Sequence, residues 1–94
     1  MITLNWSSSY KRAFNKAIKK DPHLKDRILS TMNLLRQEPF QPKLKTHKLK
    51  GILEGSWACS IDYDLRIVFD FVKNQVTDET EILLINIGTH EEVY

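Results

Sequence analysis

The chain has 94 residues, 41% of them hydrophobic and 28% charged, which fits one small globular domain with a single core. It contains no apolar run long enough to cross a bilayer and no signal-peptide pattern at its start, so we expect a cytoplasmic protein without a membrane segment. The net charge of +2 is unevenly distributed, with 12 lysines and arginines against 3 acidic residues in residues 1–50, and 2 against 9 in residues 51–94.

The N-terminal half is expected to form one strand followed by two helices. Residues 2–6 alternate between apolar and polar side chains, and the serines that follow can cap a helix. Apolar residues then recur at helical spacing with basic residues between them, which predicts an amphipathic helix to about Lys20. Asp21 as the cap and Pro22 in the first helical position predict a second amphipathic helix, which ends near Glu38. The two helices should pack as a hairpin.

The C-terminal half is expected to form a basic loop and three strands. Residues 39–56 combine prolines, glycines and lysines, which predicts an irregular loop. Residues 56–62, 65–72 and 81–87 are rich in aliphatic and aromatic side chains, so they should form a meander. The order β-α-α-β-β-β predicts an α+β fold, in which an antiparallel sheet of about four strands carries the helix hairpin on one face. One domain should span residues 1–94.

The basic half of the sequence favours a polyanionic partner. Neutralising phosphates and releasing their counterions is the main source of affinity for nucleic acids. The predicted loop carries four lysines, namely Lys43, Lys45, Lys48 and Lys50. The same charges equally fit solvated faces that only keep a small protein in solution, so charge alone leaves both interpretations open.

Several polar residues suit the cleavage of RNA without a metal ion. They are His47, Asp64, Arg66, His90 and Tyr94. In RNA the neighbouring 2′-hydroxyl is the nucleophile, so the protein needs proton carriers, which histidine provides, and positive charge for the phosphorane, which the arginine fork provides. An aromatic ring could stack on an extruded base. Each of these residues also fits an ordinary role in a loop, a turn, an ion pair or the core. Cys59, in a strand-like run, is expected to be a core residue.

Other catalytic classes lack their motifs. The sequence has no glycine-rich phosphate loop, no histidine spacing typical of a metal site and no serine elbow. Its single cysteine excludes a disulfide framework and a paired-cysteine zinc site within the chain. Neither a cofactor nor a metal is therefore expected.

Four segments carry a family resemblance over nearly the whole chain. They are Lys48-Leu49-Lys50-Gly51, Gly55-Ser56-Trp57, Asp64-Leu65-Arg66-Ile67-Val68-Phe69 and Ile87-Gly88-Thr89-His90-Glu91-Glu92-Val93-Tyr94. In this order and spacing they resemble the RelE/ParE superfamily of bacterial toxins, closest to its YafQ-like branch. The resemblance implies the toxin of a type II toxin–antitoxin system, an mRNA interferase that enters the ribosomal A site and cleaves the exposed codon, leaving a cyclic or 3′ phosphate. It also implies a labile antitoxin and a toxin–antitoxin complex that binds its own operator DNA.

The resemblance further implies a role for each site residue. His90 is the first candidate for general acid or base, and Asp64 for orienting or sharing the proton transfer. Arg66 would stabilise the charge of the transition state. His47 would be a second proton carrier or a phosphate contact, and Tyr94 would hold the base. The loop lysines, together with the helix lysines, would contact the backbone of ribosomal RNA and mRNA without reading its sequence; those of the loop are Lys43, Lys45, Lys48 and Lys50.

Two alternatives stay open. The YafQ-like branch carries a histidine where this chain has Ser60, and a tryptophan where it has Leu65. These departures allow a catalytically decayed module that binds RNA or ribosomes and cuts nothing. A ParE-like protein shares the fold but poisons DNA gyrase by binding. Because such a protein would not need His90 or Tyr94, their presence favours the ribonuclease.

Overall fold

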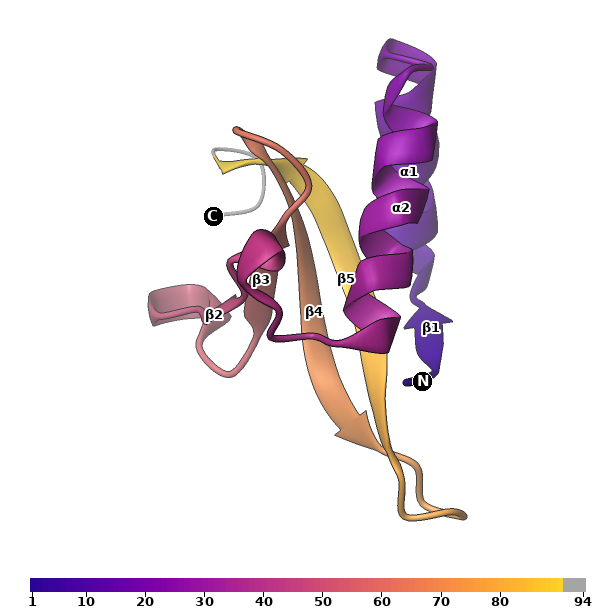
Figure 1. Ribbon diagram of the computed structural model, residues 1–94, viewed down its shortest axis with the longest axis vertical. Helices are drawn as coiled ribbons and strands as arrows, with labels where there is room; N and C mark the ends of the chain where they lie inside the picture. The colour runs from indigo at the N-terminus through magenta and orange to yellow at the C-terminus, as the bar shows by residue number, and fades with distance from the viewer. Residues whose placement is uncertain (91–94) are drawn as a thin grey trace.

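The computed structural model describes residues 1–90 and shows a curved sheet with both helices on one of its faces (Figure 1). The strands are β1 (Leu4–Trp6), β2 (His47–Lys48), β3 (Trp57–Ser60), β4 (Leu65–Lys73) and β5 (Thr80–Thr89). The helices are α1 (Ser8–Lys20) and α2 (Leu24–Gln37), with short 3-10 turns at Pro42–Leu44 and Gly51–Leu53. Neither helix is long and apolar enough to cross a membrane within the residues described. The α+β class is therefore confirmed.

The expected antiparallel sheet of about four strands is wrong in two respects. The sheet has five strands in the order β1-β5-β4-β3-β2, and β1 runs parallel to β5, with Leu4 opposite Ile82. The chain passes from β1 directly into α1, so no hairpin turn in the sequence indicates which strand pairs with β1. The additional strand, β2, lies inside the predicted basic loop and pairs His47 with Ala58. At two residues it is too short to show an alternating pattern.

The ends of the helices follow from local capping. Ser7 caps α1, because its Oγ accepts the backbone N–H of Tyr10 at 3.0 Å. The predicted start of α2 at Pro22 is wrong, since this helix begins at Leu24. Asp21 ends α1 instead, and its Oδ1 accepts the backbone N–H of His23 at 3.1 Å. The aspartate and proline thus form the turn between the helices rather than the first turn of the second helix.

The main core lies between the helices and the sheet. Tyr10 and Ile28 of the helices are fully buried with Phe69 and Leu84 of the strands. The hydroxyl of Tyr10 has no hydrogen-bond partner among the described residues, and burial raises the pKa of this tyrosine. Cys59 is 0% exposed and burial raises the pKa of its thiol to about 12, which confirms the prediction of a packing residue.

A smaller cluster lies on the other side of the sheet, which we call the second face. Its buried members are Leu49, Ala58 and Val68, with Leu53 and Ile85 packed against them. Residues of the segment after α2 therefore fold back over part of the second face. This arrangement leaves the rest of that face to polar side chains.

Candidate functional site

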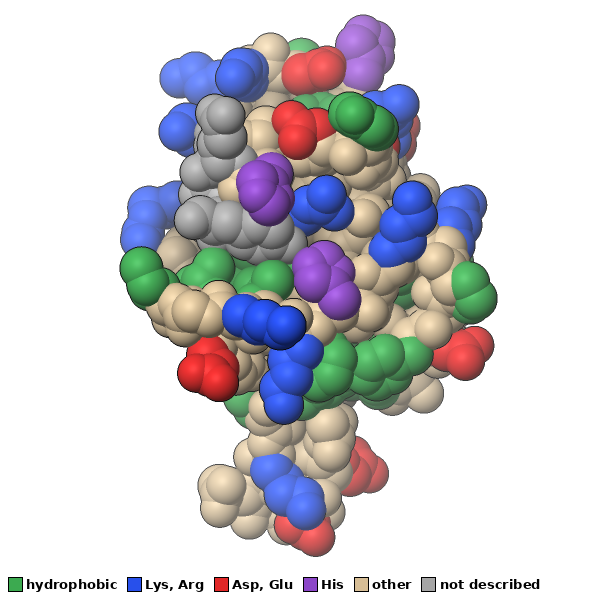
Figure 2. Space-filling model, turned by 90° about the vertical axis from the view of Figure 1, so that its left-hand side faces the viewer, with side chains coloured by type: hydrophobic (Ala, Val, Ile, Leu, Met, Phe, Trp, Pro, Cys, Tyr) green, Lys and Arg blue, Asp and Glu red, His purple; other side chains and the backbone are tan. Residues whose placement is uncertain are grey.

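The alternation of β4 assigns Arg66 to the second face. Ile67 and Phe69 belong to the main core under the helices, whereas Val68 belongs to the cluster on the other side. Successive side chains of a strand point to opposite faces, so Arg66 lies on the same face as Val68. In the register of the sheet it stands between Ser60 of β3 and Gly88 of β5. On this face, histidine, lysine and arginine side chains gather in the middle of the molecule (Figure 2).

The guanidinium of Arg66 is anchored at one end. Its Nη1 donates a hydrogen bond to Ser60 Oγ at 2.9 Å. Its Nε is buried and has no partner among the described residues. An arginine offers five N–H donors in a planar fork, and a buried donor without a partner is costly. Because Arg66 also lines a hollow, its guanidinium is a candidate to bind the oxygens of an anion.

Two of the predicted RNA-binding lysines lie beside this arginine. Lys43, Lys45 and Arg66 line one hollow of about 480 Å³, together with Ser60 and residues 61–63 of the β3–β4 turn. Cations that line the same hollow raise the local concentration of anions such as phosphate. The hollow is therefore a candidate phosphate site.

The turn between β3 and β4 is organised by Asp62. Its Oδ1 accepts the backbone N–H groups of Asp64 and Leu65, both at 3.3 Å. Its Oδ2 accepts a hydrogen bond from Arg27 of α2 at 2.6 Å, which forms an ion pair. This contact ties the turn to the helix layer. Asp64 itself is exposed in the turn, before the first residue of β4.

Breaking the Arg27–Asp62 ion pair should loosen this turn with little effect on overall stability. Arg27→Ala should lower the free energy of unfolding by roughly 0.2–1 kcal/mol, because both side chains are partly exposed and solvent screens the pair. Asp62→Ala should cost about 1–2 kcal/mol more, because it also removes the acceptor of two backbone N–H groups. Urea unfolding and amide hydrogen exchange of residues 61–65 would measure both effects. Asp62→Asn, which keeps the acceptor, and Lys25→Ala on the same helix are the controls; equal losses for Asp62→Asn and Asp62→Ala would contradict this account.

His90 also lies at the second face, at the end of β5 that pairs with Leu65 and Arg66. It directly follows β5 and is exposed. It lines a hollow of about 270 Å³ with Leu49, Lys50 and Leu53, and the two leucines belong to the cluster on the second face. Gly88, two residues before it, is the register partner of Arg66. His90 and Arg66 thus share a face but line different hollows.

His47 reaches the same face through β2. It pairs with Ala58, a member of the cluster on the second face, and its side chain is exposed. Its Nδ1 lies 3.0 Å from the carbonyl oxygen of Lys45, which orients the ring. If Nδ1 carries the proton of that contact, Nε2 is the nitrogen that can accept one.

The remaining predicted residues are dispersed. Tyr94 lies outside the described residues. The ammonium of Lys48 lies 5.8 Å from the ring centroid of Trp57, a residue that packs against the main core. Lys48 is therefore separated from Lys43 and Lys45 at the Arg66 hollow, while Lys50 lies at the His90 hollow. The four lysines form no single patch.

The sequence reasoning missed the supporting contacts of the site. Ser60 was noted only as a departure from the family pattern, whereas in the structure it holds Arg66. The sequence analysis gives Asp62 no role, although aspartate is typical of an Asx turn, in which its side chain accepts the backbone N–H two residues later. No sequence signal could have paired it with Arg27, 35 residues away. Within residues 1–90, no group of three histidine, cysteine or carboxylate side chains could hold a metal ion.

Comparisons with known proteins place these observations in a family. A family model described as the bacterial toxin of type II toxin–antitoxin systems, YafQ, matches residues 2–94. Among curated proteins, none matches this sequence. The family match covers all of the residues discussed above.

Three solved structures show the extent of the structural similarity. A conserved hypothetical protein from Helicobacter pylori is 30% identical, with a TM-score of 0.70 and full coverage of both chains. The structure of the DinJ–YafQ complex from E. coli contains a chain that is 18% identical, with a TM-score of 0.76, 100% coverage of this chain and 99% of that one. A YoeB/ParE toxin from Agrobacterium tumefaciens is 20% identical, with a TM-score of 0.75, 95% coverage of this chain and 99% of that one. The last two likenesses establish the fold alone.

Proposed function

The chain belongs to the YafQ family of type II toxins, and from this premise we propose that it is an endoribonuclease that cleaves messenger RNA on the ribosome and so inhibits translation. The cleavage would proceed by attack of the RNA 2′-hydroxyl, without a metal ion or other cofactor. The toxin would act in the cytoplasm, where translating ribosomes are found.

The arrangement of Arg66 carries this proposal. Arg66, with its Nη1 fixed on Ser60, lines a hollow that two lysines also line. A preorganised guanidinium stabilises the phosphorane more than the ground-state phosphate, because its donors match the charge that develops on the non-bridging oxygens. A site of this kind suits phosphoryl transfer.

The histidines supply the proton transfers that the reaction needs. A base takes the proton from the 2′-hydroxyl, the 2′-oxygen attacks phosphorus, and the bond from phosphorus to the 5′-oxygen breaks as an acid returns a proton to that oxygen. The products are a 2′,3′-cyclic phosphate and a free 5′-hydroxyl. His90 is our first candidate for acid or base, and His47 is the candidate for the second proton carrier or for a phosphate contact. Asp64 would orient the transfer, and Tyr94 would stack on the base.

The basic segment after α2 would hold the RNA backbone. Lys43 and Lys45 would contact phosphates next to Arg66, and Lys50 would contact them next to His90. Lys48 would contribute from its place beside Trp57. Such contacts position RNA without reading its sequence, so loss of one lysine should weaken affinity more than turnover.

The two departures from the family pattern affect this site differently. Leu65 packs against the main core, so its side chain is on the opposite side of the sheet from Arg66. Ser60 does lie in the site, where its hydroxyl fixes Arg66 instead of supplying a further imidazole. Neither departure removes the arginine or the two histidines.

The partner would be an antitoxin that binds the toxin and keeps it inactive. In E. coli, YafQ has been solved in complex with DinJ. We propose a protein of the same role for this chain, with a complex that binds its own operator DNA.

Induction of the wild-type chain in cells would test the ribonuclease. mRNA 5′ ends would be mapped while the incorporation of labelled amino acid and of labelled thymidine is followed. Cuts in phase with codons and arrested protein synthesis are the expected result. Intact mRNA with failing DNA synthesis would instead indicate a gyrase poison, and unaffected cells would indicate a decayed binding module. Purified toxin incubated with free mRNA and with translating ribosomes would then show whether the ribosome is needed.

A further inference from the structure

An exposed tyrosine is part of the candidate phosphate site. Tyr63 lies in the turn between β3 and β4 and is 97% exposed, so almost nothing in the described part of the chain covers its ring. It lines the hollow of about 480 Å³ that Arg66, Lys43 and Lys45 also line. A single exposed apolar side chain is ordinary on a protein surface. The three cations that share its hollow, rather than its exposure, point to a binding role for this ring.

The turn that carries Tyr63 is closed by hydrogen bonds. The backbone N–H of Ile61 donates to the carbonyl of Leu65 at 2.8 Å. The carboxylate of Asp62 accepts the backbone N–H groups of the two residues after Tyr63, and its ion pair with Arg27 ties the turn to α2. A ligand that binds to a preorganised segment loses less free energy to the ordering of the protein. The backbone at Tyr63 is therefore held in place, while the ring stays open to solvent.

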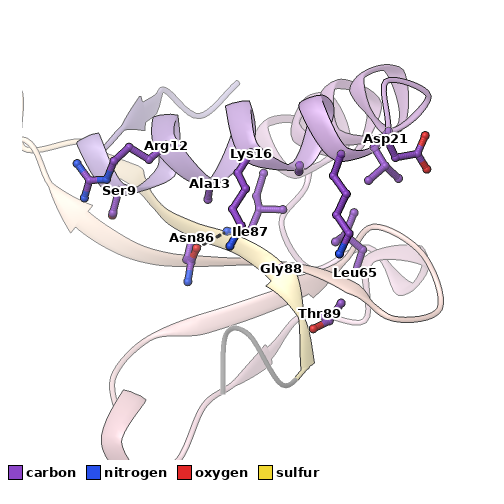
Figure 3. A pocket seen from close by; sticks show the side chains of 13 residues that line it. Ser9, Arg12, Ala13, Lys16, Asp21, Leu65, Asn86, Ile87, Gly88 and Thr89 are labelled. Carbon is purple, nitrogen blue, oxygen red and sulfur yellow. Dashed lines mark hydrogen bonds between the residues drawn. The ribbon is translucent and has the colours of Figure 1, made fainter.

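This hollow is separate from a basic cleft on the helix side of the sheet. Three cations of α1 line that cleft, which are Arg12, Lys16 and Lys20. Figure 3 shows Lys16 extending from the helix toward β5, and Leu65 among the residues of the cleft. Successive residues of a strand face opposite sides, so Arg66 faces away from this cleft and lines the hollow of Tyr63 instead.

The charges of the hollow come from different segments. Lys43 and Lys45 follow α2 and Arg66 belongs to β4, whereas the turn contributes the carboxylate of Asp62. Cations attract a phosphate and a carboxylate repels it. An aromatic face binds a nucleobase by stacking, whichever base it is, because every base has a π face. The hollow thus offers cations to a phosphate and a ring to a base.

We propose that Tyr63 binds single-stranded RNA by stacking on the base of a nucleotide that flanks the phosphate held by Arg66, Lys43 and Lys45. The inference rests on the proposed function, because it takes RNA as the ligand of this hollow. Ligand pockets measure roughly 300–1,000 Å³, and a hollow of about 480 Å³ falls in this range. Tyr63 would hold a base in addition to the one proposed for Tyr94, and it would raise affinity rather than the rate of the chemical step.

Equilibrium binding of an RNA that cannot be cleaved would test the stacking. The probe is a short single-stranded RNA with 2′-O-methyl groups, which lacks the nucleophile, measured by fluorescence anisotropy at one salt concentration. Tyr63→Ala should bind it roughly 5- to 100-fold more weakly than wild type, as expected for one stacked base. Tyr63→Phe and Tyr63→Trp keep an aromatic face and should bind within about threefold of wild type. Val76→Ala, which truncates an exposed side chain in the turn between β4 and β5, is the matched control. Equal affinity of Tyr63→Ala and Val76→Ala would overturn the proposal.

A ligand without bases separates stacking from charge. Inorganic polyphosphate carries phosphates but offers no ring to Tyr63, so Tyr63→Ala should bind it as tightly as wild type does. Lys43→Ala/Lys45→Ala should lose affinity for both ligands, because these cations attract the phosphates of either one. If Tyr63→Ala weakens both ligands to the same extent, or if Tyr63→Phe fails to keep RNA binding, the residue supports the turn without stacking and the proposal is wrong.

Cleavage is measured apart from binding. On ribosomes, Tyr63→Ala should raise the KM for mRNA more than it lowers kcat, since the ring contacts the substrate without moving a proton. Binding of the inert RNA that depends on Tyr63, in a toxin that leaves mRNA intact, would refute the proposed function alone. Codon-phased cleavage by a toxin whose RNA affinity is independent of Tyr63 would refute this inference alone.

Discussion

Arg66→Ala is expected to lower the rate of mRNA cleavage by about 10²- to 10³-fold. This range is typical of removing one preorganised hydrogen-bond donor that stabilises the charge of the transition state. The guanidinium is fixed by Ser60, and Arg66 lines the hollow that Lys43 and Lys45 also line. Alanine removes both the charge and the donors. Single-turnover cleavage by purified toxin on ribosomes that carry a defined mRNA would measure the effect.

Related variants separate the contributions to this loss. Arg66→Lys keeps the charge but not the fork, so it should recover only part of the rate. Ser60→Ala leaves the guanidinium in place without its anchor and should cost far less than the loss of the arginine itself. Lys73→Ala, at the other end of the same strand, removes a cation whose ion pair with Asp78 is exposed, and it is the matched control. A folded Arg66→Ala protein that cleaves at the wild-type rate would remove this residue from the mechanism.

The face of Arg66 is a part of the site that sequence can predict. Strand alternation in β4 separates the residues that pack under the helices from Arg66 and Val68, and the apolar pattern of residues 65–72 already indicates a strand. Asp64 could not be placed in the same way, because it lies in a turn, where alternation does not apply. Its geometry depends on Asp62, which holds the backbone N–H of Asp64.

The pairing of the strands is harder to predict from the sequence than the positions of the helices and strands. Amphipathic spacing located both helices to within a few residues, because each buries one face against the sheet. The parallel pairing of β1 with β5 joins residues about 78 positions apart, such as Leu4 and Ile82, and no turn between them signals it. The short strand β2 is stabilised by pairing with β3 rather than by its own sequence. Long-range contacts decide both features.

Basic residues that lie in one half of the sequence are found on two different surfaces of the folded protein. In the sequence, the basic residues of the first half form one block. In the structure, Lys43 and Lys45 lie near Arg66, whereas Arg12, Lys16 and Lys20 line the cleft on the helix side. One basic half of the sequence therefore provides two separate basic surfaces.

His90→Ala is expected to lower mRNA cleavage by about 10²- to 10⁴-fold, the range typical of losing a positioned general acid or base. The exposed imidazole follows β5 on the same face as Arg66, and it lines a hollow of about 270 Å³ that Lys50 and Leu49 share. In cells that express this variant, the codon-phased 5′ ends of mRNA should disappear and protein synthesis should continue.

The design of the His90 experiment separates proton transfer from folding. His23→Ala, at the turn between the helices, removes an exposed histidine away from the site and should leave cleavage unchanged. Because the hollow beside His90 is open to solvent, added imidazole should restore part of the rate to purified His90→Ala toxin, whereas it cannot repair a misfolded chain. Undiminished cleavage by His90→Ala would assign the proton transfer to His47 and Asp64. A loss that imidazole fails to reverse, accompanied by a lower melting temperature, would mean that His90 supports the end of β5 rather than the reaction.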